Sequence, residues 1–343
     1  METKITEWNG DIYSMHKYLE EIISPLYLVG GSVRDEYLGR VCNDLDFTTH
    51  HSPDDILEAF KGKHKTFKEG KRFGTIGIII DGIKIEITTF RNEYYISGSR
   101  KPEVEYVNSI DQDLSRRDFT INAIARRFNK TIDPFNGIDD IKNHRIHVVG
   151  SQPHARFKED PLRMLRACRF SSQLEFRISK QTFKGIQTNS HKILEVSKER
   201  WVNEIDKILM SENPYLGLGY LADTKLLNFI IPELAIQINY NQNSKYHTHD
   251  LWNHTKLVVQ HSPEDINIRW GALLHDIGKP FVREEKPGRS IYAKHEIIGE
   301  ELVERLSRHL KFSNGRRQIV KEIVRNHIED ENSPIKKADD EAK

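Results

Sequence analysis

The hydrophobic pattern of the chain changes its period near residue 155. Between about residues 27 and 135, short apolar runs rich in β-branched residues alternate with turn residues, as in TIGIIIDGIKIEITTF at 75–90. The Asp-Gly pair inside that run predicts a hairpin. From about residue 155 onward, apolar residues recur with a period near 3.6, as in EDPLRMLRACRF and ELVERLSRHL, which predicts helices. We therefore expect a mixed α/β domain followed by helical domains.

Length and composition describe a multidomain protein without membrane segments. The chain has 343 residues, of which 37% are hydrophobic and 30% charged. No run of about 18 apolar residues could span a bilayer, and the first residues lack the apolar core of a signal peptide. These features predict a cytoplasmic protein with no membrane contact. The two cysteines, Cys42 and Cys168, are too few for a disulfide framework and are expected to be buried.

A polar, Asn-rich stretch at 238–250 is predicted to link two helical regions. Half of the 16 histidines follow residue 246, which suggests a separate domain with its own chemistry. The last residues, 331–343, are charged and lack a clear period, so a disordered, solvated tail is expected there.

Two carboxylates stand two positions apart in the strand-like run DLDFTT. Residues i and i+2 of a strand point to the same side, so Asp44 and Asp46 would converge above one face of a sheet. Such a pair is stable as anions when a cation lies between them, and Mg²⁺ suits oxygen ligands. Upstream, Gly31 and its neighbour Gly30 would let the backbone approach a phosphate, with Arg34 nearby. The alternative is a simple turn in which one aspartate caps a backbone group.

A series of motifs gives this pair a context. GGSVRDEYLGR, NDLDFTT, RRDFTINAIA, DPFNGIDDI, EDPLRMLRACRF and ERWVNE occur in this order, and over roughly residues 25–235 the chain resembles the class II tRNA nucleotidyltransferase and bacterial poly(A) polymerase family. The resemblance implies an α/β head of the polymerase β nucleotidyltransferase type followed by all-α neck, body and HD domains. The expected boundaries are 1–140 for the head, 141–205 for the neck, 206–240 for the body and 247–330 for the HD domain.

The resemblance also implies the chemistry of the head. Asp44 and Asp46 correspond to the catalytic aspartates of the family, which bind Mg²⁺ while an RNA 3′-hydroxyl attacks the α-phosphate of a nucleoside triphosphate and releases pyrophosphate. Glu86, in the strand-like run IKIEITT, is either a third carboxylate near the metal or a surface residue of an edge strand.

The motif RRDFTINAIA is expected to contact the nucleotide. The resemblance assigns Arg117 to the triphosphate and Asp118 to a ribose hydroxyl, whereas Asn122 is expected to hold the loop together. In the following DPFNGIDDI, Asp133 and Asp140 are predicted to cap local structure.

The segment EDPLRMLRACRF is predicted to form a helix with a polar face. Asp160, Arg163, Arg166 and Arg169 recur every three positions, which by itself describes an ordinary helix with weak ion pairs. The resemblance makes Asp160 and Arg163 the pair that selects the base, because cytosine and adenine both present an amino donor beside a ring-nitrogen acceptor. Arg166 and Arg169 would then bind phosphates, and ERWVNE would support the helix.

Full CCA addition to tRNA from CTP and ATP is the activity that we expect. The loop between Phe90 and Arg116 has full length for the family, which argues against CC-only addition, and the chain lacks the long basic extensions of poly(A) polymerases. An A-adding enzyme or a poly(A) polymerase is the alternative within the family. A tRNA-binding protein without catalysis would have no need for the metal ligands, and tRNA is expected to be recognised by shape and backbone.

The histidine-rich end resembles an HD-type metal-dependent phosphohydrolase domain. In LWNHTK and LLHDIGKP, His254, His275 and Asp276 match the first ligands of a second divalent metal ion. His295 and His327 are further candidates, and Asp330 is the nearest acidic residue for the last position. The domain is either an active phosphohydrolase or a helical scaffold that keeps a partial site.

Overall fold

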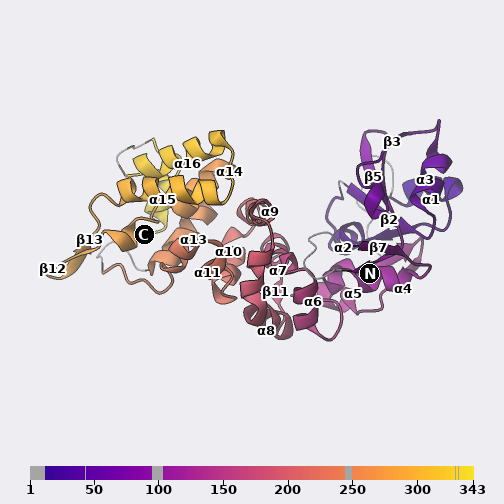
Figure 1. Ribbon diagram of the computed structural model, residues 1–343, viewed down its shortest axis with the longest axis horizontal. Coiled ribbons are helices and arrows are strands. Elements are labelled where there is room, and N and C mark those ends of the chain that lie inside the picture. The colour runs from indigo at the N-terminus through magenta and orange to yellow at the C-terminus, as the bar shows by residue number, and fades with distance from the viewer. Residues whose placement is uncertain (1–11, 43, 95–102, 244–248, 329, 331) are drawn as a thin grey trace. The chain divides into compact units, whose positions relative to one another are not determined.

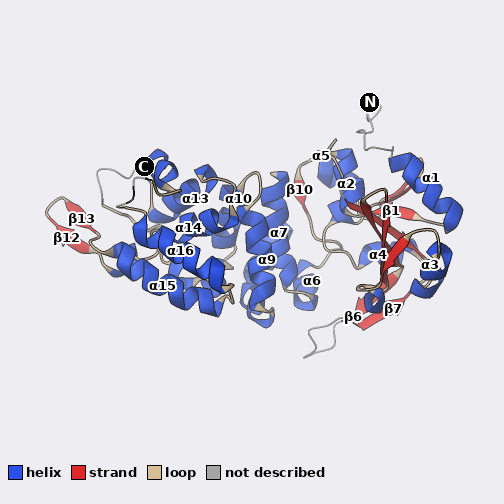
Figure 2. Ribbon diagram, turned by 90° about the horizontal axis from the view of Figure 1, so that it is seen from above, coloured by secondary structure: helices blue, strands red, loops and turns tan. Residues whose placement is uncertain are grey.

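The computed structural model of the chain describes residues 12–42, 44–94, 103–243, 249–328, 330 and 332–343. These residues form two compact units, Met1–Asp160 and Pro161–Lys343 (Figure 1). The strands of the main sheet lie in the first unit, and the second unit consists almost entirely of helices (Figure 2). The α/β head followed by helical domains is thus confirmed.

The main sheet of the first unit has the strand order β3-β4-β5-β2-β1-β8-β9. Strands β2 and β5 are parallel, and the other neighbouring pairs are antiparallel. The strands of this sheet are β1 (Tyr27–Val29), β2 (Asp44–Thr49), β3 (Lys65–Phe67), β4 (Thr75–Ile80), β5 (Ile83–Thr89), β8 (Ala125–Arg127) and β9 (Lys130–Ile132). Strand β2 therefore lies in the middle, between β5 and β1.

The predicted hairpin at Asp81-Gly82 joins β4 and β5. Both residues have positive φ angles, 51° and 82°, as a two-residue type I′ turn requires. Ile80 and Ile83 are the first cross-strand pair after the turn. In β4 the alternate residues Ile76, Ile78 and Ile80 are buried, as expected for a strand with one face against the core.

Helices surround this sheet, with α2 packed against β1 and β2, and α3 against β4 and β5. The α-helices of the first unit are α1 (Ile12–Ile22), α2 (Gly31–Tyr37), α3 (Pro53–Phe60), α4 (Ile110–Ser115), α5 (Gly137–Lys142) and α6 (Pro153–Glu159). Strands β6 (Arg91–Tyr94) and β7 (Glu103–Tyr106) pair with each other, and β10 covers Arg145–Ile146. The 95–102 part of the predicted full-length loop lies outside the described residues.

The structure extends the first unit beyond residue 140, where we predicted the head to end. Helix α6 belongs to this unit. Its Arg156 donates hydrogen bonds to the backbone carbonyls of Ser115 (3.1 Å) and Arg117 (2.6 Å). These hydrogen bonds join α6 to segments far away in the sequence, which a hydrophobic pattern does not reveal, and the boundary between head and neck stays a prediction.

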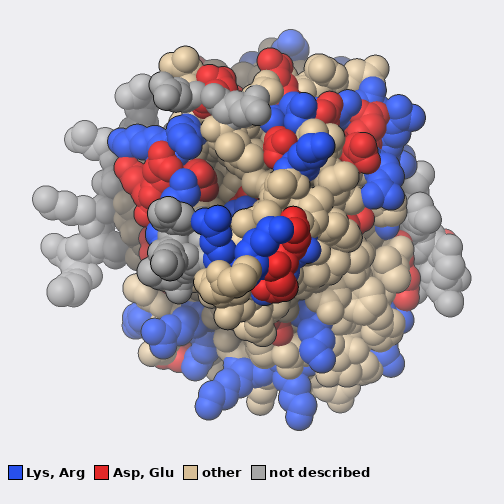
Figure 3. Space-filling model, turned by 90° about the vertical axis from the view of Figure 1, so that its left-hand side faces the viewer, with Lys and Arg blue, Asp and Glu red and all other residues tan. Residues whose placement is uncertain are grey.

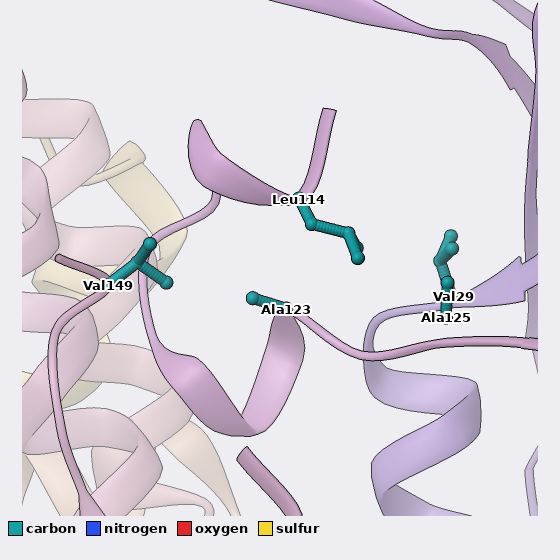
Figure 4. Packing of buried hydrophobic residues seen from close by; sticks show 5 residues of the cluster. All are labelled: Val29, Leu114, Ala123, Ala125 and Val149. Carbon is teal, nitrogen blue, oxygen red and sulfur yellow. The ribbon is translucent and has the colours of Figure 1, made fainter. Parts of the chain in front are cut away.

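A small apolar cluster lies beneath the motif residues of the head. It brings together Val29 at the end of β1, Leu114 of α4, Ala125 of β8, and Ala123 and Val149 from the connecting segments (Figure 4). All five are buried. Because Val29 precedes Gly30 and Leu114 lies three residues before Arg117, this packing fixes the backbone on both sides of the predicted nucleotide site.

The second unit contains the neck, body and HD segments. Helix α10 packs against α7 and α13, and α14 packs against α16. The α-helices of the second unit are α7 (Leu162–Leu174), α8 (Lys180–Asn189), α9 (Lys198–Leu209), α10 (Pro214–Asp223), α11 (Leu227–Ile230), α12 (Pro232–Ala235), α13 (Leu251–His261), α14 (Ile266–Leu274), α15 (His295–His309), α16 (Asn314–Asn326) and α17 (Lys336–Glu341). Its short strands are β11 (Arg177–Ile178) and the hairpin β12 (Glu284–Lys286) and β13 (Arg289–Ile291). Residues 244–248 of the predicted linker lie outside the described part.

The prediction of a disordered tail at 331–343 is wrong for the described residues 332–343. Helix α17 packs against α13 and buries Ile335, Ala338 and Ala342. These apolar positions follow a helical spacing of three and four residues, but the surrounding lysines and aspartates obscure the pattern.

Within the described residues, every helix is too short or too polar to cross a lipid bilayer. On the face seen in Figure 3, acidic and basic side chains lie next to one another. Helices α15 and α16 supply part of this mixture through ion pairs such as Lys321–Glu304, at 2.9 Å. Pairs of this kind, which are partly open to solvent, contribute little to stability.

Candidate functional site

The turn after β1 requires a glycine. Gly30 has φ 70° and ψ −134°, a conformation that is rare for residues with a side chain. A Cβ atom at this position would lie 2.9 Å from Nη1 of Arg117 and 3.9 Å from Oδ2 of Asp46. At Gly31, which begins α2, a Cβ would meet only the guanidinium of Arg34, at 3.4 Å. The position that requires a glycine is therefore Gly30, one residue before Gly31, which was predicted to contact the nucleotide.

The two aspartates lie on the face of β2 opposite to the core. Leu45 and Phe47 are buried, and Asp44 and Asp46 alternate with them. In the parallel register with β5, Asp46 is the partner of Glu86. Glu86 therefore lies beside the pair, which agrees with the alternative that it is a third carboxylate near the metal.

The electrostatics of this face favour a bound cation. Burial raises the pKa of Asp46 to about 6; Arg117 opposes the shift, whereas Glu86 and Asp44 reinforce it. A half-buried carboxylate with two acidic neighbours is costly to ionise unless a positive charge is close. Oxygen ligands of this kind are those that Mg²⁺ prefers. The residues present thus fit the magnesium ion that the sequence motif predicts.

Ser32 connects the glycine turn to the aspartates, a role that sequence reasoning missed. Its Oγ donates to the carbonyl oxygen of Asp44 and accepts a hydrogen bond from the N–H of Asp46, both at 3.1 Å. The side chain is buried. One hydroxyl therefore sets the position of β2 relative to the start of α2.

Arg34 and Asn122 hold the loop of the RRDFTINAIA motif. The Arg34 guanidinium donates to both carboxylate oxygens of Asp35 (2.8 and 2.9 Å) and to Oδ1 of Asn122 (2.7 Å). Nδ2 of Asn122 then donates to Oδ1 of Asp118 at 3.2 Å, and the Phe119 N–H donates to the same oxygen at 2.8 Å. The predicted structural role of Asn122 is confirmed.

Arg117 is positioned by a buried carboxylate. Its Nη2 lies 3.3 Å from Oδ2 of Asp113, which is fully buried and also paired with Arg116 at 2.9 Å. Burial works against ionisation of Asp113, but the two arginines prevail and lower its pKa. Arg156, which sequence reasoning missed, holds the same segment through the carbonyl of Arg117. The Arg117 side chain is thus oriented toward Asp46 and Gly30.

Of the two acids of DPFNGIDDI that were predicted to cap local structure, Asp133 does so, whereas Asp140 bonds to side chains instead. Asp133 accepts hydrogen bonds from the N–H groups of Gly137 (2.7 Å) and Ile138 (2.9 Å) at the start of α5. Asp140 accepts from the hydroxyl of Thr120 at 2.6 Å and pairs with Arg145.

The arginines of α7 have different environments. Arg163 is buried in the first turn of α7, whereas Asp160 ends α6 and is the last residue of the first unit. Arg166 lies over the ring of Phe170, at 5.6 Å from its centroid. The role of Asp160 and Arg163 in base selection stays a prediction.

Arg169 does not have the predicted phosphate-facing position. It is buried and forms an ion pair with Glu204 of α9 at 3.2 Å. Trp201 of α9 is also buried and donates to the carbonyl of Ile193. The motif ERWVNE thus supports α7, as predicted. It does so by pairing with Arg169, which the three-residue spacing had placed on the polar face of the helix.

Four histidines converge on one carboxylate in the HD segment. Oδ2 of Asp276 lies 3.1 Å from Nε2 of His275 and 3.5 Å from Nε2 of His254. Oδ1 lies 3.1 Å from Nε2 of His295 and 3.7 Å from Nε2 of His327. All five side chains are buried. The predicted ligands His254, His275 and Asp276 are brought together, and so are the two weaker candidates.

Backbone carbonyls orient each imidazole. The Nδ1 atoms of His275, His295 and His327 lie 2.7–2.8 Å from the carbonyl oxygens of Ala272, Tyr292 and Val324, and Nδ1 of His254 lies 3.3 Å from that of Ala342. A carbonyl only accepts hydrogen bonds, so each Nδ1 carries a hydrogen, and in a neutral ring Nε2 is then the nitrogen that can bind a metal ion. Metal-binding histidines in proteins are oriented in this way.

Asp339 of α17 is the second carboxylate beside this cluster, which the sequence analysis did not identify. Its Oδ1 lies 3.1 Å from Nε2 of His254 and 3.7 Å from Nε2 of His275. Burial opposes protonation of His254, but Asp276 and Asp339 outweigh it and raise the pKa of His254 to about 9. Asp330, the nearest acid in sequence, is exposed and accepts from the N–H of Asn332. The donor set of imidazole nitrogens and carboxylates fits a divalent transition metal.

The first unit has the fold and the paired carboxylates expected of a metal-dependent nucleotidyltransferase, and the second has a buried cluster of histidines around Asp276 of the kind expected in an HD domain. Residues 26–147 match the family model for the poly A polymerase head domain. Residues 175–237 match that for the probable RNA and SrmB-binding site of polymerase A, and residues 246–343 match that for the HD domain.

Curated relatives are named as CCA-adding enzymes. That of Ligilactobacillus salivarius is 43% identical over 205 residues, which cover 59% of this chain and 50% of the relative. That of Geobacillus thermodenitrificans is 37% identical over 266 residues, covering 76% and 62%. The chain thus spans between about half and three fifths of the length of these relatives.

Solved structures agree with these relatives. The crystal structure of the Bacillus stearothermophilus CCA-adding enzyme in complex with CTP is similar, with a TM-score of 0.70 and 28% identity over 91% of this chain and 68% of that one. The chain is thus similar to the tRNA nucleotidyltransferase and poly(A) polymerase family in its head and RNA-binding segments, and to HD domains in its C-terminal segment.

Proposed function

We propose that this protein is a template-independent RNA nucleotidyltransferase that adds the 3′-terminal CCA to tRNA from CTP and ATP. The observation that carries the proposal is the arrangement of Asp44 and Asp46 beside Arg117 at the Gly30 turn. The glycine turn, which has no Cβ, leaves room for a triphosphate, and the arginine can pair with its phosphate oxygens. The two adjacent carboxylates can bind the metal ions. Curated relatives named as CCA-adding enzymes support the same activity.

Each group of the head has a role in this reaction. Asp44 and Asp46 would hold Mg²⁺, which when bound activates the 3′-hydroxyl and stabilises the leaving pyrophosphate. Arg117 lies where it can pair with phosphate oxygens, and Asp113 keeps its guanidinium in that orientation. Asp118, placed by Asn122, is suited to accept a hydrogen bond from a ribose hydroxyl.

The choice of base is proposed for Asp160 and Arg163. A carboxylate accepts from the exocyclic amino group of cytosine or adenine, and a guanidinium donates to the adjacent ring nitrogen. Uracil and guanine present the opposite polarity at these positions, so a buried donor or acceptor would be left unpaired. The names of the relatives favour CCA addition over the alternatives of A addition or poly(A) synthesis.

Single-nucleotide incorporation tests this proposal. The protein is incubated with tRNA lacking its 3′ end, Mg²⁺ and one labelled triphosphate at a time. Incorporation of CTP, and of ATP on a tRNA ending in CC, is expected, with UTP and GTP at least tenfold lower. Arg163→Ala should reduce this selectivity, whereas Asp46→Asn should abolish incorporation of every nucleotide. Equal use of all four nucleotides by the unaltered protein would refute the assignment of Asp160 and Arg163.

We also propose a metal-dependent phosphohydrolase activity for the HD domain. The convergence of four imidazoles and two carboxylates on a buried point favours this activity over a purely structural scaffold. Hydrolysis of bis(p-nitrophenyl) phosphate with Mn²⁺ should persist in Asp44→Ala and disappear in His275→Ala. If His275→Ala leaves the hydrolysis unchanged, the HD site is not the site of this activity.

A further inference from the structure

We infer that the HD segment, residues 246–343, positions helix α7 for nucleotide selection, and that Trp270 and Arg269 of α14 are the positioning residues. The inference rests on the proposed role of Arg163 in choosing the base, and it adds residues that lie outside the nucleotide site. The connection between the two is α9, which packs against α7 and also against α14 (Figure 2). All three helices belong to the second unit.

The first contact between α9 and the HD segment is made by Asp206. Its Oδ1 accepts a hydrogen bond of 2.7 Å from Nε1 of Trp270, which is fully buried. Arg316 of α16 donates from Nη1 to Oδ1 and Oδ2, at 3.1 and 3.0 Å. Hydrogen bonds to a charged group are stronger than those between neutral groups. Two helices of the HD segment therefore hold one carboxylate of α9.

The same helix holds α7 with a residue two positions earlier. Glu204 forms the buried ion pair with Arg169 of α7, at 3.2 Å. Residues two positions apart in a helix do not share a face. Helix α9 therefore presents Glu204 to α7 and Asp206 to the HD helices, so that a displacement at one contact changes the other.

The second contact closes the C-terminal end of α9. The last carbonyl groups of a helix lack partners within it, and a positive charge there is favourable. Arg269 is buried and donates from Nη1 to the carbonyl oxygens of Leu209 and Ser211, the latter at 3.3 Å. The hydroxyl of Ser211 also shares a hydrogen bond with that of Ser172 on α7, which donates to the carbonyl of Asn213 at 2.7 Å. A cation of the HD segment and a serine of α7 thus meet at the same short turn.

The packing around this turn is close. A Cβ atom at Gly217 of α10 would lie 2.7 Å from Cβ of Ser172 and 2.8 Å from Cγ2 of Ile208 on α9. Close-packed elements transmit a displacement because no free volume absorbs it. A shift of α9 should therefore also move α7.

The supported residues of α7 lie far from the end that is proposed to select the base. Arg163 lies in the first turn, nine positions before Ser172, which corresponds to about 13 Å along a helix. A tilt of about 5° at the supported end would displace the first turn by about 1 Å. A misplacement of this size can reduce incorporation by up to about 100-fold. Loss of the support should thus weaken base selection without removing the metal ligands of the head.

Trp270→Phe tests the inference, because it keeps an aromatic ring and removes the hydrogen bond to Asp206. Hydrogen–deuterium exchange of the full chain should be faster in α7 and α9 than in the unaltered protein. The preference for CTP over UTP should fall about fivefold, with KM for CTP changing more than kcat. Asp206→Asn, which retains an acceptor for Trp270, should have a smaller effect than Asp206→Ala.

A second tryptophan provides the matched control. Trp252 of α13 is also buried, but within the described part of the chain its Nε1 has no hydrogen-bond partner. Trp252→Phe therefore removes a similar volume and no hydrogen bond. The exchange of α7 and the preference for CTP should both stay at the values of the unaltered protein. Circular dichroism shows whether each variant is folded, and Asp206→Ala, at a half-buried position, replaces Trp270→Phe should that variant not fold.

Three results would overturn the inference: unchanged exchange of α7 in folded Trp270→Phe, an unchanged preference for CTP in that variant when the unaltered protein is selective, or equal effects of Trp270→Phe and Trp252→Phe. Equal use of all four nucleotides by the unaltered protein would instead refute the proposed base selection. The exchange of α7 would then decide by itself whether the HD segment supports this helix.

Discussion

Replacement of Ser32 by alanine should impair nucleotide addition more than it destabilises the fold. The substitution removes two hydrogen bonds of 3.1 Å, one to the carbonyl of Asp44 and one from the N–H of Asp46. A hydrogen bond contributes about 1 kcal/mol net, and an unpaired buried donor costs about 1–3 kcal/mol. We expect a loss of about 2 kcal/mol in the free energy of unfolding. Because Asp46 loses its anchor to the glycine turn, we also expect a drop of roughly 100-fold in the incorporation rate.

Ser52→Ala is the matched control for this prediction. Ser52 caps α3, where its hydroxyl also takes part in two hydrogen bonds, both with Asp55. Loss of such a cap costs about 1 kcal/mol, but the incorporation rate should stay unchanged. The rate is measured under single-turnover conditions with CTP, and stability by urea denaturation. Normal incorporation by Ser32→Ala, or an equal loss in both variants, would show that Ser32 does not position the aspartates.

Three further results are expected from the same structure. Gly30→Ala should abolish incorporation, because its Cβ would lie 2.9 Å from Arg117 and the φ angle of 70° is unfavourable for alanine; a normal rate would show that the turn tolerates a side chain. Glu204→Ala should lower the free energy of unfolding by about 3 kcal/mol, because it removes the buried ion pair with Arg169; urea denaturation measures this, and an unchanged midpoint would contradict a stabilising ion pair. The Mg²⁺ concentration for half-maximal incorporation should rise as the pH falls through about 6. The pKa of Asp46 is raised to that value, so protons compete with the metal below it, and a requirement that stays constant between pH 7 and 5 would speak against Asp46 as a ligand.

The head was predictable because its signals are local. The alternation of Leu45 and Phe47 with two aspartates defines both the strand and its exposed face, and the Asp81-Gly82 turn fixes the hairpin. Both features depend on residues within a few positions of one another. The same holds for the capping role of Asp133.

The missed features depend on contacts between distant segments. Ser32 bonds to β2 across a separation of 12 to 14 residues, and nothing in its neighbourhood distinguishes it from a helix N-terminal serine. Arg169 belongs to an apparent polar face, but packing against α9 turns it inward to Glu204. Asp339 lies in a charged segment that resembles a tail, and only the docking of α17 on α13 brings it to His254.

The sequence of the product 3′ end tests the central claim most directly. A tRNA lacking CCA is incubated with the full chain, Mg²⁺ and all four nucleoside triphosphates, and the products are sequenced. We predict that cytidine, cytidine and adenosine are appended in this order and that Asp46→Asn appends nothing. Products that end in long adenosine tracts, or CCA addition by the folded Asp46→Asn variant, would contradict the account.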